Sequence, residues 1–169
     1  DKGMWQQGRF TWLLATLYNT VEPRQEWLEL ARHGIEFIRR HGFDHDGRMF
    51  FQVTRDGRPV RRRRYVFTET FACIALAAYA KAAGDEDAAQ QARALFRLVI
   101  DHADTPDKIP PKVDPKTRPT KGMGHPMILL ATAQVLRDTI GDPLAEDRIN
   151  QSIEEIRRDF VNHELEAVM

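Results

Sequence analysis

The chain has 169 residues, of which 42% are hydrophobic, and its 25 basic and 25 acidic residues balance to a formal net charge of zero. This length can bury one sizeable core, and the charge balance provides no general attraction to nucleic acid. No apolar segment approaches the roughly 20 residues that a bilayer span requires. We therefore expect a single soluble domain without a nucleic-acid or membrane partner.

The single cysteine, Cys73, lies in an apolar helical run and has no partner for an internal disulfide. Such a cysteine is typical of a small core residue in a reduced compartment, so we expect a cytoplasmic protein. The first residues already belong to a motif, and residues 165–169 carry no capping or turn signal. We expect residues 1–169 to form one partial domain that is cut at both ends.

The helical spacing of residues 4–18 brings an arginine among large aromatic residues. Trp5, Arg9 and Trp12 are separated by four and three residues, so they share one face of the helix. This face suits the floor of a pocket. The alternative is that Arg9 extends along a tryptophan to solvent or pairs with a carboxylate.

A second helix with Pro23 in its first turn is expected to complete a helical hairpin. Its apolar face is expected to contain Trp27, Leu30, Ala31, Ile35 and Ile38. Residues 48–54 and 59–62 are then expected to form two short strands around Asp56-Gly57, a strong two-residue turn signal.

Two further helical hairpins are expected over residues 67–83 with 88–101 and over residues 127–140 with 145–160. The prolines of residues 103–122 predict an extended loop between them. The first helix of each hairpin is apolar and the second is charged on one face, which indicates an inner and an outer ring of helices. Periodicity alone fits a superhelical stack of repeats equally well.

Four segments resemble the N-acylglucosamine 2-epimerase family in their order and spacing. They are Trp5-Gln6-Gln7-Gly8-Arg9 at the start of a helix, the glycine-bounded hairpin of residues 47–59, residues 64–72 and residues 118–130. The resemblance implies an all-α fold, an (α/α)6 barrel of six hairpins. This chain then supplies three hairpins, about half of the barrel, with a short β-hairpin insertion.

The resemblance also implies epimerisation at C2 of a sugar, by removal and return of the proton next to the carbonyl. It implies that Arg9 contacts sugar oxygens, that Trp5 provides a flat wall, and that Tyr65 and Glu69 offer hydrogen bonds, with His125 as a further pocket candidate. Glu69 can instead be a carboxylate favoured at a helix start, Tyr65 an ordinary half-buried aromatic residue, and His125 a structural or solvated residue.

The family's two catalytic histidines fall beyond Met169, so we expect no catalytic residue in this chain and no activity from it alone. Where some sugar epimerases and isomerases of this superfamily place a histidine, this sequence has Met127, which favours the N-acylglucosamine type over the cellobiose type and thus an N-acylated hexosamine as substrate. Two other interpretations remain: a glycoside hydrolase or lyase on the same barrel, with Glu69 or Asp44 as acid, and a noncatalytic helical repeat scaffold.

We expect no cofactor and no metal. His163 and Glu166 can meet on a helix but lack a third ligand.

The run Arg61 to Arg64 is expected to form a solvated strand edge that resists aggregation. The expected partners are a small sugar and a second copy of the chain in a homodimer.

Overall fold

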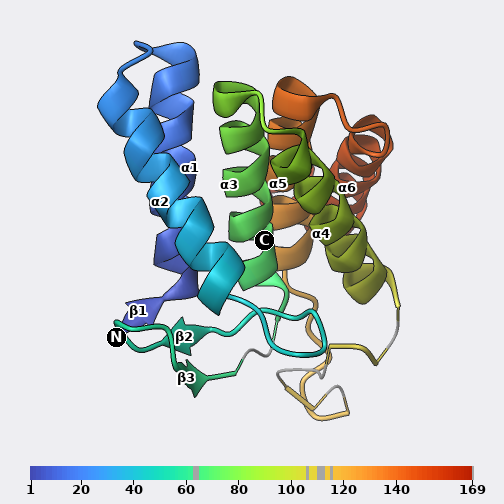
Figure 1. Ribbon diagram of the computed structural model, residues 1–169. Helices are drawn as coiled ribbons and strands as arrows, with labels where there is room; N and C mark the ends of the chain where they lie inside the picture. The colour runs from blue at the N-terminus through green and yellow to red at the C-terminus, as the bar shows by residue number, and fades with distance from the viewer. Residues whose placement is uncertain (63–64, 106, 110–112, 115, 169) are drawn as a thin grey trace.

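The computed structural model describes residues 1–62, 65–105, 107–109, 113–114 and 116–168, and these form three antiparallel helical hairpins (Figure 1). The helices are α1 (Met4–Thr20), α2 (Gln25–His41), α3 (Phe67–Ala83), α4 (Glu86–Asp104), α5 (Gly124–Ile140) and α6 (Ala145–Phe160). In each hairpin the first helix belongs to an inner layer and the second covers it from outside. The expected alternation of inner and outer helices is therefore confirmed.

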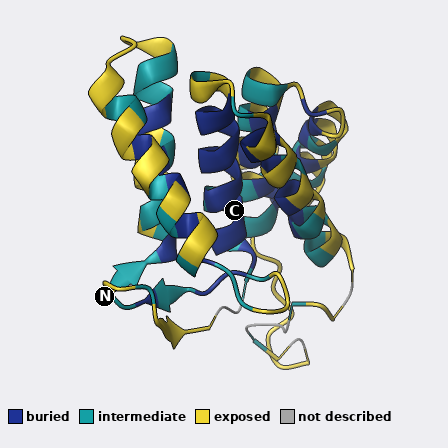
Figure 2. Cartoon of the chain, in the orientation of Figure 1, coloured by how far each residue is buried: buried dark blue, intermediate teal, exposed yellow. Residues whose placement is uncertain are grey.

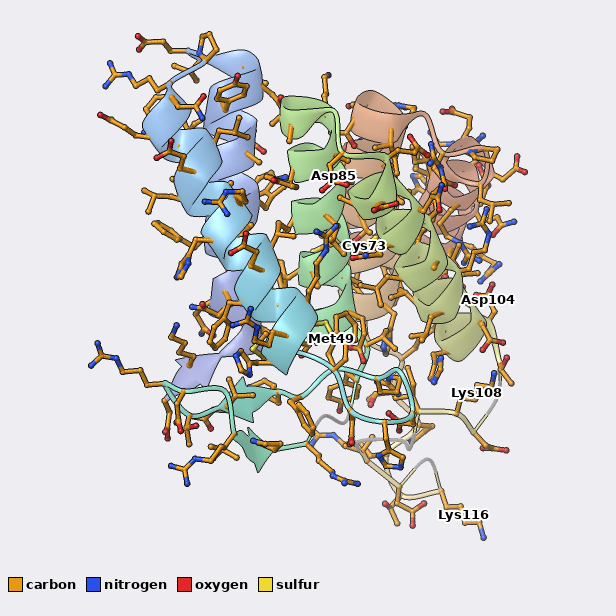
Figure 3. All side chains as sticks on the ribbon, in the orientation of Figure 1. Met49, Cys73, Asp85, Asp104, Lys108 and Lys116 are labelled. Atoms are coloured by element: carbon orange, nitrogen blue, oxygen red, sulfur yellow. The ribbon has the colours of Figure 1, made fainter. Side chains whose placement is uncertain are left out.

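Helix α3 is the centre of the inner layer and packs between α1 and α5. Nearly all of its length is buried, as Figure 2 shows, and its many alanines allow close contact with helices on several sides. Cys73 lies midway along α3 (Figure 3), where its buried thiol donates to the carbonyl of Ala92 at 3.3 Å. Burial raises the pKa of this thiol, which is consistent with a core residue.

The expected β-hairpin is present but shorter, as β2 (Gln52–Val53) and β3 (Pro59–Arg61), with Gly57 at φ +92° in its turn. A strand that the sequence analysis missed, β1 (Lys2–Gly3), pairs antiparallel with β2 and gives the sheet order β1-β2-β3. Two residues are too few to show the alternation of apolar and polar side chains that identifies a strand in a sequence. This strand is therefore defined only by its pairing with β2. All three residues of edge strand β3 are exposed.

Residues 161–168 form a second small hairpin, β4 (Val161–Asn162) with β5 (Ala167–Val168). His163 lies in its turn. The prediction that His163 and Glu166 meet on a helix is therefore wrong. Arg61 and Arg62 are exposed as expected for a solvated edge, whereas residues 63–64 of the arginine run lie outside the described residues.

Several helix details also differ from the sequence prediction. Pro23 precedes α2 instead of lying in its first turn, and Leu30 is 53% exposed because the buried face of α2 is narrower than its apolar pattern. Helix α4 begins earlier than predicted because Asp85 accepts a hydrogen bond from the Ala88 N–H at 2.9 Å. Between α4 and α5 the described residues contain no helix or strand, as the prolines predicted.

All three inner helices begin at the same end of the molecule. The sheet of β1, β2 and β3 and the loop before α5 also lie at this end (Figure 1). Residues from far-apart segments of the sequence, including the candidate pocket residues, therefore meet there.

Candidate functional site

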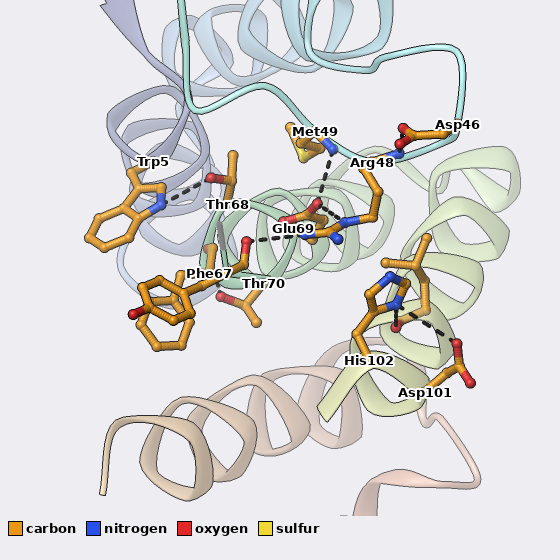
Figure 4. Close-up of polar contacts among 12 residues, drawn as sticks. Trp5, Asp46, Arg48, Met49, Phe67, Thr68, Glu69, Thr70, Asp101 and His102 are labelled. Atoms are coloured by element: carbon orange, nitrogen blue, oxygen red, sulfur yellow. Dashed lines mark hydrogen bonds and ion pairs between the residues drawn. The ribbon is translucent and has the colours of Figure 1, made fainter. Parts of the chain in front are cut away.

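Trp5 is the centre of an aromatic cluster at the start of the inner helices. It lies half-buried in the first turn of α1, and its indole N–H donates to Thr68 Oγ1 at 3.0 Å (Figure 4). Its ring centroid lies 5.7 Å from that of Phe51, 5.9 Å from that of Phe67 and 5.7 Å from that of Phe71. Aromatic pairs at such separations attract each other, so these contacts fix the plane of the indole.

Phe67 connects Trp5 to two further predicted site residues. The ring of Tyr65 stacks on Phe67 at 5.5 Å, and the imidazole of His125 lies 5.3 Å from Phe67 and 6.0 Å from Tyr65. We call the continuous surface of Phe51, Trp5, Phe71, Phe67, Tyr65 and His125 the aromatic wall. It brings together Trp5, Tyr65 and His125, three of the predicted site residues. The sequence analysis missed Phe67, although its position one helical turn before Phe71 was an available signal.

Arg9 lies beside the wall and is exposed. Its guanidinium carbon is 5.2 Å from the ring centroid of Phe71, and within the described part of the chain it forms no ion pair. The preceding residue explains this placement, because a Cβ on Gly8 would lie 2.8 Å from the backbone carbonyl carbon of Phe71. Gly8 lets α1 and α3 approach closely, and Arg9 is carried to the rim of the wall.

Glu69 does not face solvent with the other site candidates. It is completely buried, and its Oε1 accepts hydrogen bonds from Arg48 Nε at 2.6 Å and from the Met49 N–H at 3.0 Å (Figure 4). Its Oε2 is buried without a hydrogen-bond partner among the described residues. Arg48 also donates from Nη2 to the carbonyl of Tyr65 at 3.1 Å. Arg48 is a residue that the sequence analysis did not single out.

His125 is the histidine of the wall, and its environment favours the neutral imidazole. Burial lowers its pKa, and this effect outweighs the opposing influence of the Glu155 carboxylate. Glu155 is itself paired with Lys121 at 2.8 Å. His125 Nε2 is buried and has no hydrogen-bond partner within the described ranges. A neutral imidazole can either donate or accept one hydrogen bond at such an atom.

Asp44 and the hollow at the end of α6 lie apart from the aromatic wall. Asp44, considered as an acid, has a side chain only 8% exposed and lies 3.4 Å from Arg62. Among the residues whose placement is described, no three His, Cys, Asp or Glu side chains gather as a metal site, and no helix is long and apolar enough to cross a membrane. A hollow of about 500 Å³ at the end of α6, lined by residues 159–164, contains none of the predicted site residues.

The comparisons with known proteins agree on one family and one fold. The family model described as N-acylglucosamine 2-epimerase (GlcNAc 2-epimerase) matches residues 1–169. An N-acylglucosamine 2-epimerase of Bos taurus is 29% identical over 140 residues, covering 80% of this chain and 33% of the relative. A cellobiose 2-epimerase of Ruminococcus albus is 31% identical over 97 residues, covering 57% of this chain and 25% of the relative.

Among solved structures, the cellobiose 2-epimerase of Bacillus thermoamylovorans matches with a TM-score of 0.82 at 18% identity. The match covers 96% of this chain and 46% of that protein. The chain therefore has the fold of about half of an (α/α)6 barrel, and it spans less than half the length of the relatives it matches.

Proposed function

Because the chain belongs to the N-acylglucosamine 2-epimerase family, we propose that it forms one side of the pocket of a sugar 2-epimerase. The reaction removes the proton at C2, next to the carbonyl of the opened sugar, and returns a proton on the other face. The general base and acid of this reaction are expected in parts of the relatives that this chain does not span, and residues 1–169 alone are expected to be inactive.

The observation that carries this proposal is the aromatic wall with Arg9 at its rim. The flat face of Trp5 offers an apolar surface for the C–H groups of a sugar ring, and the indole is held by a hydrogen bond to Thr68 and by contacts with three phenylalanines. The guanidinium of Arg9, which forms no ion pair with the residues that the structure describes, can donate to the sugar oxygens that gain negative charge when C2 loses its proton. Tyr65 and His125 extend the wall with a hydroxyl group and an imidazole that can form hydrogen bonds to a sugar.

We propose an N-acylated hexosamine as the substrate, because Met127 stands where some sugar epimerases and isomerases of this superfamily are expected to have a histidine. Met127 lies in the first turn of α5 and is 53% exposed. Its thioether cannot donate a hydrogen bond to a second sugar unit, whereas an apolar side chain accommodates an acyl methyl group. Cellobiose is the alternative substrate to compare, because the chain is similar to cellobiose 2-epimerases as well as to N-acylglucosamine 2-epimerases.

The test is exchange of the C2 proton in deuterated water, measured by NMR in the complete protein with N-acetylglucosamine and with cellobiose. Arg9→Gln should lower the exchange rate by about 10²-fold, because it removes a donor aimed at developing charge. Arg32→Gln, at an exposed arginine of α2, is the control and should retain the rate. An unchanged rate in the Arg9 variant would show that this residue has no role in the reaction. If the unmodified protein exchanges the C2 proton of neither sugar, the proposed epimerase function is wrong.

The cytoplasmic location and the homodimer remain predictions. The buried, unpaired Cys73 supports a reduced compartment. Fractionation of the source cells and light scattering of the complete protein would test the two predictions separately.

A further inference from the structure

The ion pair between Arg48 and Glu69 lies almost entirely out of water. Glu69 has no exposed side-chain surface, and the side chain of Arg48 is only 12% exposed. Burying two charges costs desolvation, which such a pair recovers only with good geometry and further hydrogen bonds. This pair therefore differs from the exposed pairs of the helix surfaces, such as Arg32 with Glu36.

The guanidinium of Arg48 joins two points of one short segment. Nε donates to the Glu69 carboxylate in the first turn of α3, and Nη2 donates to the main-chain carbonyl of Tyr65, four residues earlier. The Glu69 carboxylate in turn accepts from the Met49 N–H, which fixes the loop that carries Arg48. Arg48 thus holds both ends of residues 65–69.

The segment held in this way carries most of the contacts of the aromatic wall. Tyr65 stacks on Phe67 and touches His125, Phe67 also touches Trp5, and Thr68 accepts the indole hydrogen bond of Trp5. A shift of residues 65–69 would therefore move the wall at several points. Neither Arg48 nor Glu69 belongs to the wall itself.

We propose that Arg48 and Glu69 are a positioning pair that fixes residues 65–69, and with them the aromatic wall, while neither residue touches the sugar. The inference rests on the proposed function, and it replaces the expectation that Glu69 offers a hydrogen bond to the substrate. Arginine is needed because its planar fork reaches two acceptors at once. A lysine keeps the charge but donates from a single point, so it satisfies the carboxylate and releases the Tyr65 carbonyl.

The decisive experiment is a double-mutant cycle in the complete protein with Arg48→Lys, Tyr65→Ala and the combined variant, followed by kcat and KM for C2 proton exchange. Misplacement of the wall should lower kcat/KM in Arg48→Lys by about 10²-fold. The same substitution should cost less when Tyr65 is already alanine, because the part of its effect that acts through the Tyr65 ring has then been removed. Arg32→Lys, the same change in an exposed pair, is the control. An undiminished loss in the Tyr65→Ala background would overturn the proposal.

A second measurement does not depend on activity. Hydrogen exchange followed by mass spectrometry should show faster exchange of peptides covering residues 65–71 in Arg48→Lys and Glu69→Gln, with α5 and α6 unchanged. Unaltered exchange in these peptides, or a lowered melting temperature with unchanged kcat/KM, would overturn the positioning role. If the unmodified protein exchanges C2 protons of neither sugar while residues 65–71 respond as expected, the proposed function fails and the placement of the segment by the pair stands.

Discussion

At the scale of single residues, Gly8 sets the distance between α1 and α3. Helix propensity alone predicts that Gly8→Ala stabilises the protein by about 1 kcal/mol. The contact predicts the opposite sign, because the new Cβ would lie 2.8 Å from the backbone of Phe71 and neither backbone is free to yield. We expect a loss of about 1–3 kcal/mol in the free energy of unfolding. Urea titration measures it, with Gly122→Ala as the control because, apart from its chain neighbours, no described residue has an atom within 4 Å of that Cβ. A more stable Gly8→Ala variant would contradict the argument.

His125 predicts a pH dependence of stability. Burial lowers the pKa of His125 below its ordinary value of 6.5. Between the lowered pKa of the folded protein and the ordinary pKa of the unfolded chain, the unfolded chain binds a proton that the folded chain does not. The free energy of unfolding should therefore rise with pH across this window and fall as the pH is lowered through it. Urea titrations from about pH 5 to about pH 7.5 measure the slope. His125→Gln should flatten it, and His33→Gln, at an exposed position of α2, is the control. Equal slopes in the unmodified protein and His125→Gln would contradict the assignment.

At the scale of elements, Asp85 defines the start of α4. Its carboxylate accepts from the Ala88 N–H at 2.9 Å and lies 3.5 Å from Arg39 of α2. Asp85→Ala removes both interactions and should cost about 1 kcal/mol, whereas Asp85→Asn keeps the capping oxygen and should cost much less. Thermal unfolding separates the two variants. Equal destabilisation by both would show that the ion pair with Arg39, and not the cap, is the important contact.

The helical elements followed from the sequence because their signals are local. The bounds of α3 and α6 are those predicted, and Gly84 and Gly141 end α3 and α5 in left-handed conformations that a side chain would disfavour. β1 could not be predicted, because its two residues become a strand only by pairing with β2.

Contacts between residues that are far apart in the sequence also limited the prediction of the site. The grouping of Trp5 with Tyr65 follows from a family resemblance, while the role of Arg48 depends on a contact across 21 residues.

At the scale of the whole molecule, three hairpins leave apolar side chains of the inner helices uncovered. On α1, Phe10 is 58% and Leu13 is 44% exposed, and in a closed (α/α)6 barrel an inner helix has neighbours on both sides. We expect residues 1–169 on their own to bind the dye ANS and to self-associate, because these side chains remain in water. Phe10→Ser with Leu13→Ser should reduce both effects. Val21→Ser is the control, since Val21 is 69% exposed but lies in the turn after α1. A monodisperse monomer that unfolds cooperatively and binds no dye would show that the inner layer is stable without further hairpins.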